Sequence, residues 1–335
     1  DYWRLNDRIR LRKNPRYWDA AHTQSDVIDL LPCVVPATAL NLYETGAADI
    51  VWDKELVPPD LLDVVLQRPD FHVHDYLGNY FYRYNVTKPP FHDARVRQAL
   101  ALAIDKRRIV ERITKGGEKP AACVCPPGIL NGTNLYHPPA GLPYRPDQAR
   151  QLLAAAGYPG GRGFPLFHYT FNNVESHKQI AVELRQMWQR ELGIHVELRQ
   201  LEWKTYLRAQ AELDYDLVRS SWIGDYNDPN TFLDLFMSDN PNNRTGWRNA
   251  RYDQCLREAN AAISPAERQR LLQQAERLLV EEELPIVPLY FYVSIEYYDS
   301  DKISGIYPNL RVEHPLRAIR NLARRGTGAT RPHQP

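Results

Sequence analysis

A few side chains of this sequence are of types that bind metal ions or form disulfides. His72 and His74 are two residues apart, so in a strand they share one face. Two histidines without a third ligand nearby make a weak metal site, because zinc sites in proteins use three or four side chains. The four cysteines are too few for a disulfide scaffold and include no CxxC pair. We therefore expect no bound metal, and four packed or surface thiols: Cys33, Cys123, Cys125 and Cys255.

The carboxylates that come closest to a catalytic pair are Asp214 and Asp216. They alternate within a predicted strand and share one face, a pattern more typical of solvent exposure than of acid–base catalysis. The sequence contains no HExxH, GxSxG, GxGxxG or P-loop motif. We expect a protein that is not an enzyme and that needs no cofactor.

The composition is that of a globular protein without a strong electric field. The 335 residues are 43% hydrophobic and 25% charged, which is enough for two lobes with their own cores. Lysine plus arginine number 42 against 41 acidic residues, so no field would collect nucleic acid. No apolar run is long enough for a membrane helix, and the charged first residues are no signal peptide, so any export signal is expected outside this sequence. The 20 tyrosines and 7 tryptophans suit either an amphipathic ligand cleft or a structural core.

The spacing of apolar residues predicts strands and helices in alternation. One amphipathic helix is predicted from Asp93 to Ile113, with Arg97 on its solvated face. Another is predicted over residues 264–282, beginning with a capping box of Ser264 and Glu267. The succession of strand, helix and strand predicts a mixed α/β lobe. The other predicted strands are residues 8–12, 27–31, 48–52, 80–85, 166–172, 194–198, 215–220 and 286–295, and the other predicted helices are 37–45, 60–67, 146–156, 176–192 and 203–212.

Ordered segments along nearly the whole chain form a recognisable pattern. The first is the hairpin that contains Lys13-Asn14-Pro15-Arg16-Tyr17-Trp18-Asp19, and the most specific runs from Glu202-Trp203-Lys204-Thr205-Tyr206 to Trp222-Ile223-Gly224-Asp225-Tyr226-Asn227-Asp228-Pro229. Residues 46–50, 88–91, 95–100, 103–106 and 152–159 add to it. Together they resemble family 5 of the extracellular solute-binding proteins, the oligopeptide- and dipeptide-binding proteins of ABC importers.

The resemblance implies an α/β fold of the periplasmic binding protein-like class II, with two lobes joined by hinge strands. Residues 1–78 would be the C-terminal part of lobe I, residues 79–285 the ligand-binding lobe II, and residues 286–320 the return strand and closing segment of lobe I. In the family an N-terminal region precedes the hairpin, so we expect the first lobe to be incomplete. Residues 321–335 have few apolar side chains, and we expect a disordered tail there.

The resemblance also implies a set of ligand-binding residues. The family aspartate that matches Asp225 pairs with the ligand's α-amino group, and Arg219 matches an arginine that could hold a carboxylate through two N–H groups. From the residues alone, Asp225 could equally be a turn or helix cap, and Arg219 could pair with Asp216 or another surface acid. The other implied contacts are two pocket aromatics, three polar pocket residues and a hinge tyrosine: Trp203, Trp222, Asn172, His177, Asn242 and Tyr292.

Two positions depart from the oligopeptide-binding pattern. Gln210 and Glu296 stand where that pattern has arginines. A pocket that lacks two cations should prefer a different ligand charge or length, because an unpaired buried charge is costly. We expect a neutral, cationic or differently sized peptide-like ligand.

The implied function is that of the substrate-binding component of an ABC peptide importer. Such a component binds an oligopeptide-like ligand between its lobes and delivers it to a permease in the cytoplasmic membrane. We expect a monomer in the periplasm or outside the cell, with a lipid anchor as one option, and no nucleic acid partner. The alternative is the ligand-sensing module of a cytoplasmic transcriptional regulator, which a helix-turn-helix upstream of residue 1 would favour.

Overall fold

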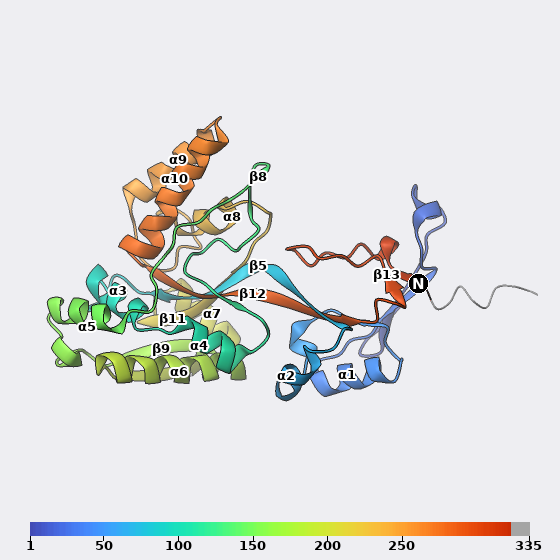
Figure 1. Cartoon of the computed structure of the whole chain (residues 1–335), viewed down its shortest axis with the longest axis horizontal. Coiled ribbons are helices and arrows are strands. Elements are labelled where there is room, and N and C mark those ends of the chain that lie inside the picture. Colours follow the sequence, from blue (N-terminus) through green and yellow to red (C-terminus); the bar gives the residue numbers. More distant parts are fainter. Residues whose placement is uncertain (323–335) are drawn as a thin grey trace, which may run out of the picture. The chain divides into compact units, whose positions relative to one another are not determined.

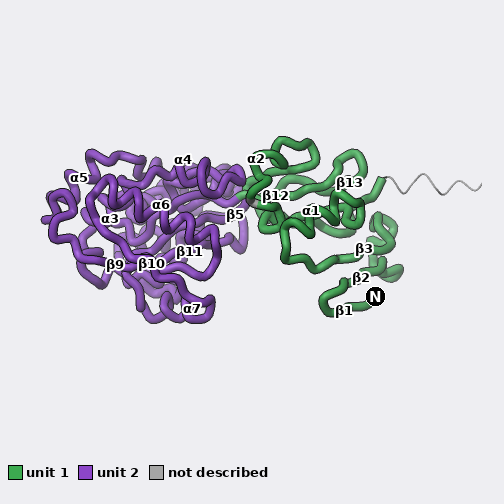
Figure 2. The backbone as a smooth tube through the Cα atoms, turned by 90° about the horizontal axis from the view of Figure 1, so that it is seen from below, with its two compact units in different colours: residues 1–75, 293–335 green, residues 76–292 purple. Residues whose placement is uncertain are grey.

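The chain forms two compact units. The computed structural model describes residues 1–322, drawn in Figure 1 and divided by colour in Figure 2. Unit 2 comprises residues 76–292, and unit 1 comprises residues 1–75 together with the residues from 293 onward. Both boundaries fall inside long strands, β5 (Phe71–Tyr84) and β12 (Ile286–Tyr298), each of which runs from one unit into the other.

Unit 2 is built on a mixed sheet with the strand order β10-β9-β11-β5-β12. The strands β9 (Phe167–Asn172), β10 (Val196–Leu201) and β11 (Leu217–Ile223) are parallel, and β11 is antiparallel to β5. Parallel neighbours need crossover connections, which α6 (Glu175–Leu192) and α7 (Trp203–Ala211) supply. The carboxyl ends of three strands therefore meet at one edge of the sheet.

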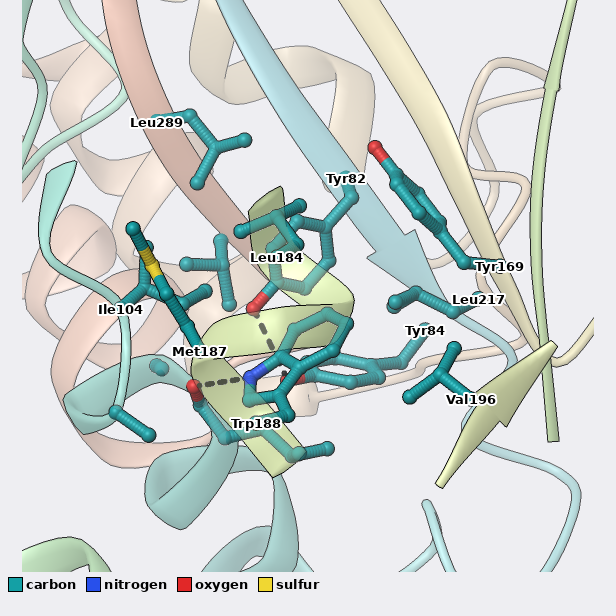
Figure 3. Packing of buried hydrophobic residues seen from close by; sticks show 14 of the residues in the cluster. Tyr82, Tyr84, Ile104, Tyr169, Leu184, Met187, Trp188, Val196, Leu217 and Leu289 are labelled. Atoms are coloured by element: carbon teal, nitrogen blue, oxygen red, sulfur yellow. Dashed lines mark hydrogen bonds between the residues drawn. The ribbon is translucent and has the colours of Figure 1, made fainter. Parts of the chain in front are cut away.

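The largest core of the molecule lies on one face of this sheet (Figure 3). The indole of Trp188 from α6 is fully buried, and its ring centroid is 5.9 Å from that of Tyr82 and 6.5 Å from that of Tyr169. Its Nε1 donates to the carbonyl of Leu100 in α3 (Ala94–Leu102) at 2.9 Å. The ring of Trp188 therefore packs among apolar side chains while its N–H has an acceptor, so its burial leaves no polar group of the indole unsatisfied.

Other helices cover the opposite face of the sheet. Tyr206 of α7 packs with Val218, and Phe81 of β5 lies edge-on to Phe236 with ring centroids 5.9 Å apart. Near Phe236, α8 (Asn230–Leu233) is a single turn. The helices α9 (Ala250–Ala261) and α10 (Pro265–Arg277) pack side by side, as Figure 1 shows.

Unit 1 has a smaller core. It contains an antiparallel sheet of β1, β2 and β3, and its main aromatic contact is the stacking of Phe71 on Tyr297 at 4.5 Å. The elements of unit 1 are β1 (Tyr2–Arg4), β2 (Arg8–Arg12), β3 (Val27–Leu30), α1 (Pro36–Glu44), β4 (Ile50–Val51), α2 (Leu62–Val65), β13 (Ile303–Ser304) and β14 (Arg320–Asn321). The remaining elements of unit 2 are α4 (Lys106–Ile109), β6 (Lys119–Pro120), β7 (Leu130–Asn131), β8 (Asn134–Leu135) and α5 (Pro146–Ala155).

Two features of the predicted helix from Asp93 to Ile113 are wrong. The helix is interrupted, because Asp105 begins a new helix, α4, by accepting a hydrogen bond from the backbone N–H of Arg108 at 3.1 Å. Arg97 is not solvated: it is 2% exposed, and its guanidinium donates to the backbone carbonyls of Phe91, at 2.6 Å, and Glu283. A guanidinium has five donors, so it can satisfy several carbonyls in a buried loop.

Two smaller expectations also differ from the structure. The capping box is absent, because Ser264 makes no side-chain cap and Glu267 pairs instead with Arg270 at 2.7 Å. Asn321, placed in the predicted disordered tail, is the last residue of β14, and the rest of that tail from residue 323 lies outside the described residues. The four cysteines are free thiols. Over residues 1–322 we find no helix with the length and apolar character needed to cross a membrane.

Candidate functional site

Most of the predicted ligand residues lie at the carboxyl edge of the unit 2 sheet. Asn242 does not, because its carbonyl bonds to Arg83, which pairs with Val218 near the amino end of β11. Asn172 is the last residue of β9, and Trp222 is the last but one of β11. His177 lies in the first turn of α6, and Trp203 is the first residue of α7. In open α/β sheets, ligands bind in the crevice outside the carboxyl ends of the strands, so this edge is the place where the fold favours a site.

Arg219 is a buried cation at the centre of this region. Its side chain comes from β11 and is 8% exposed, and its guanidinium carbon lies 4.8 Å from the centre of the Tyr80 ring. One terminal nitrogen, Nη2, donates to the hydroxyl of Tyr292 at 3.1 Å. The buried Nε has no hydrogen-bond partner in the part of the chain that the structure describes. The guanidinium thus retains donors that could bind a carboxylate.

The alternative in which Arg219 pairs with Asp216 is wrong. The carboxylate of Asp216 lies 3.3 Å from Lys88 Nζ and accepts the backbone N–H of His168 at 3.1 Å. Within residues 1–322 no acidic side chain forms an ion pair with Arg219. A buried cation without an acidic partner is costly to maintain.

An aromatic wall surrounds Arg219. Tyr80 is fully buried and stacks on Tyr290 with ring centroids 4.8 Å apart, and Tyr290 meets Tyr292 edge-on at 5.6 Å. The ring of His177 lies 5.5 Å from that of Tyr80. Burial raises the pKa of the Tyr80 and Tyr290 phenols, so both stay neutral at physiological pH. Tyr80 is a residue of this wall that the sequence did not predict as part of the site, although it alternates with Tyr82 and Tyr84.

Gly78 allows this wall to form. A Cβ atom at this position would lie 2.5 Å from Cδ1 of Ile223 and 3.0 Å from Cδ2 of Tyr292. A larger residue would therefore force Ile223 to move and would press against the ring of Tyr292.

Trp222 and Asn172 lie on the other face of the sheet from Arg219. In the register of β11 with β5, Trp222 is opposite Asn79, while Arg219 is opposite Tyr82, and successive residues of a strand point to opposite faces. Nε1 of Trp222 and Oδ1 of Asn172 are buried and have no hydrogen-bond partner among the described residues. A donor and an acceptor are therefore available there for a polar group or for water.

Tyr206 packs on the sheet face that carries Trp222 and bonds to the backbone of Arg219. Its hydroxyl donates to the backbone carbonyl of Arg219 at 2.6 Å, and the exposed ring of Trp203 stacks on it with centroids 5.5 Å apart. Asn242 lies in a turn on the same face as Trp222, where its carbonyl accepts a hydrogen bond from Arg83 at 2.8 Å. Arg83 is itself buried.

Asp225 follows directly after β11, in a segment that we call the Asp225 turn (residues 224–230). The backbone N–H of Gly224 donates to the carbonyl of Leu77 at 2.7 Å, and that of Asp225 donates to Oγ1 of Thr231 at 2.9 Å. Although the backbone is held, the side chain is exposed, and its carboxylate forms no hydrogen bond or ion pair within residues 1–322. It is therefore available to bind a cation.

The alternative in which Asp225 is a cap is wrong as well. The aspartate that bonds to the backbone at the start of α8 is Asp228, whose Oδ1 accepts the N–H of Asn230 at 3.0 Å, while the N-cap position is Pro229. The two aspartates are only three positions apart, and the sequence could not tell which of them points toward the helix.

The two positions that depart from the oligopeptide-binding pattern are both buried. Gln210 belongs to α7 in unit 2. Glu296 belongs to unit 1, where its Oε1 lies 2.6 Å from Nε2 of His314. The charge of Glu296 therefore has a partner within its own unit.

The histidines considered as metal ligands are in unit 1. Their rings are 6.3 Å apart, and Nε2 of His72 lies 3.1 Å from the carbonyl oxygen of Tyr298. Among residues 1–322 no group of three or more His, Cys, Asp or Glu side chains is arranged to hold a metal ion.

Comparison with known proteins gives consistent matches. Residues 1–244 match the family model described as "Bacterial extracellular solute-binding proteins, family 5 Middle". The periplasmic oligopeptide-binding protein OppA of Salmonella typhimurium is 32% identical over 319 residues, covering 91% of this chain and 58% of that protein. The probable deoxycholate-binding periplasmic protein YgiS of Escherichia coli is 34% identical over 296 residues, covering 87% of this chain and 54% of that protein. The chain thus spans little more than half the length of these relatives.

Solved structures agree with the sequence matches. A periplasmic oligopeptide-binding protein, OppAIV, of Borrelia burgdorferi superposes with a TM-score of 0.79 at 30% sequence identity, covering 96% of this chain and 63% of that one. The α/β binding-protein fold expected from the sequence is thereby confirmed.

Proposed function

The chain belongs to family 5 of the bacterial extracellular solute-binding proteins, as its sequence predicted, and we propose that it is part of the non-catalytic receptor of an ABC peptide importer. In this proposal the protein works in the periplasm or outside the cell and hands a peptide-like ligand to a membrane permease. Unit 2 is the ligand-binding lobe, and unit 1 is part of the other lobe. The strands β5 and β12, which run from one unit into the other, are the hinge crossings.

The observation that carries the proposal is the state of Arg219. A buried guanidinium without an acidic partner fits a ligand carboxylate, which would complete its hydrogen bonds and neutralise its charge. The neighbouring hydroxyl of Tyr292 and the face of Tyr80 hold the guanidinium in place before the ligand arrives. A group that is already ordered loses little entropy when it binds.

Asp225 supplies the opposite charge. Its exposed carboxylate suits the α-ammonium group of a peptide, and within residues 1–322 the cation that pairs with the rest of the turn is Arg268, which binds Asp228. A ligand with a positive and a negative group therefore has a partner for each at one edge of the sheet.

The remaining residues are suited to side-chain recognition. In the proposal Trp203 and Trp222 contact apolar parts of the ligand, while Asn172, His177 and Asn242 contact polar atoms or water. The unpartnered Nε1 of Trp222 and Oδ1 of Asn172 support this role. Polar groups that bind through water accept many side chains, which suits a receptor for varied peptides.

A steroid carboxylate is the main competing ligand, because the relative YgiS is named for probable deoxycholate binding. Deoxycholate would use Arg219, but it has no ammonium group for Asp225. The role of Asp225 therefore distinguishes the two ligand classes.

Binding to the whole protein tests the proposal. A library of di- to pentapeptides, the same library with acetylated amino termini, and deoxycholate are compared by native mass spectrometry and calorimetry. We expect the free peptides to bind, and Arg219→Met to weaken binding by about 10- to 100-fold, as the loss of a charge-assisted hydrogen bond should. Asp225→Asn should weaken the free peptides and leave the acetylated ones little changed.

The matched control is Arg199→Met on β10, which β9 separates from β11. Arg199 pairs with Asp214, which precedes β11, at 2.9 Å, so its loss should leave affinity unchanged. Binding of deoxycholate but of no free peptide, or equal affinity in Arg219→Met, would contradict the proposal.

A further inference from the structure

Arg268 of α10 joins two segments of unit 2 to its own helix through three hydrogen bonds. Its Nη2 donates to Oδ1 of Asp228 at 2.7 Å and to Oδ1 of Asn230 at 2.6 Å, both in the Asp225 turn. Its Nη1 donates to Oδ1 of Asn131 in β7 at 2.6 Å. The side chain is 18% exposed, so water screens these bonds only in part.

A second bond ties the same two segments together. The backbone N–H of Leu130 donates to Oδ1 of Asn227 at 3.1 Å, and Asn131 is in turn held by the carbonyl of Pro265, to which its Nδ2 donates at 3.0 Å. The Asp225 turn is thus fixed from β7 as well as from α10, while the side chain of Asp225 stays outside this network.

Acidic side chains near Arg268 give its positive charge a further role. Asp225, Asp228 and Asp234 lie within ten residues of one another, and burial together with the charge of Asp228 raises the pKa of Asp234, while the charge of Arg268 lowers it. If Arg268 were absent, the repulsion between Asp228 and Asp234 would lose the opposing charge of Arg268.

We propose that Arg268 is a positioning residue for ligand binding: it does not touch the ligand, but it holds the Asp225 turn so that the carboxylate of Asp225 is presented in a single geometry. The inference rests on the proposed role of Asp225. A turn that is ordered before binding costs the complex less entropy than one that must be ordered by the ligand.

Hydrogen–deuterium exchange of the ligand-free whole protein tests the structural half of the proposal. Arg268→Met should raise exchange of the amides of residues 224–231 by about tenfold or more, as expected for the loss of hydrogen bonds to a charged group. The matched control is Arg270→Met, because Arg270 lies on the same helix and pairs only on the surface with Glu267. Unchanged exchange in Arg268→Met, or an equal rise in Arg270→Met, would overturn the proposal.

Affinity for the peptide library tests the functional half. Arg268→Met should weaken binding in the wild-type background but have little further effect in Asp225→Asn, since both changes remove the same contact. Arg268→Lys should restore part of the affinity, because a lysine can still reach one of the acceptors. Fully additive losses, or an unchanged affinity, would show that Arg268 does not act through Asp225.

Asn131→Ala provides a second route if Arg268→Met does not fold. This variant removes one acceptor of Arg268 without exposing a buried charge. It should cause a smaller change of the same kind in exchange and affinity. If neither exchange nor affinity changes, the result would count against the proposal. The exchange measurement needs no ligand. If the wild-type protein binds no peptide, the proposed function fails, while the exchange result still decides whether Arg268 holds the turn.

Discussion

The two units differ in how far they bury their own apolar side chains. In unit 2, rings such as Trp188 and Tyr82 are fully enclosed. In unit 1, Trp18 is 83% exposed and Val34 is 91% exposed, and no residue of the β1–β3 sheet is buried. Buried apolar area is the main stabilising contribution in folding, so the larger core of unit 2 should contribute more stability than the smaller core of unit 1. The candidate site lies in the unit with the larger core.

The units also differ in their buried charges. Arg219 in unit 2 has tyrosines around it and no acid, whereas Glu296 in unit 1 lies against His314. A buried charge with a partner inside the protein contributes to structure, and one without such a partner is available to a ligand. The contrast agrees with the proposed role of Arg219, although Oε2 of Glu296 also has no hydrogen-bond partner among the described residues.

The largest expected effect comes from the core of unit 2. Trp188→Ala should lower the free energy of unfolding by about 3–5 kcal/mol, because it leaves a cavity and an unsatisfied carbonyl at Leu100. Trp18→Ala in unit 1 is the control and should change stability by less than about 0.5 kcal/mol. Urea denaturation of both variants measures the difference, and similar losses would remove the contrast between the units.

The next effect tests the buried pair in unit 1. His314→Ala leaves Oε1 of the buried Glu296 without its partner and should destabilise the protein by about 2–3 kcal/mol. His22→Ala removes a histidine that contacts Asp19 on the surface and should have almost no effect. Thermal unfolding of the two variants is the measurement. A neutral His314→Ala would mean that Glu296 does not need this partner.

A buried acid in unit 2 should make stability depend on pH. Glu276 is fully buried and accepts backbone N–H groups of Val124, at 2.6 Å, and Cys125, at 2.9 Å, yet burial raises its pKa to about 6. A raised carboxyl pKa adds stability below its ordinary value near 4.5, and that stability is lost as the pH rises through about 6.

Glu276→Gln should abolish this dependence. Relative to the variant, the wild-type protein should lose about 2 kcal/mol of unfolding free energy between about pH 4.5 and about pH 7. Denaturation curves over this range measure the difference between the two proteins, in which other titrating groups cancel. A difference that stays constant with pH would show that Glu276 does not titrate there.

The smallest effect is expected on the surface of unit 1. The hydrogen bonds from Arg10 to Asp29 hold the pKa of that carboxyl at about 2, so its contribution is present at neutral pH and is lost as the pH falls toward that value. Asp29→Asn should lower the thermal midpoint slightly at low salt and not at high salt, because an exposed pair is screened. A large loss that persists in high salt would place this pair among the buried ones.

The regular elements of unit 2 could be predicted from the sequence because their signals are local. The alternation of apolar and polar residues predicted β9, β10 and β11, and apolar residues at helical spacing predicted α6 and α7. The predicted helix from Asp93 to Ile113 was wrong at its middle, where a cap at Asp105 outweighs a continuous apolar spacing. Arg97 was misassigned because the carbonyls that receive its donors come from separate loops.

By itself the sequence determined the family, the α/β class and the residue types available for binding, since all of these depend on local spacing and on ordered motifs. Only the tertiary structure decided which charges are available. Asp216 pairs with Lys88, and Asp228 bonds to the backbone N–H of Asn230 and to Arg268, so Arg219 and Asp225 are left without acidic or basic partners among the described residues. Whether a charge has a partner depends on residues distant in the chain that packing brings within about 3 Å of it, and no local pattern records that distance.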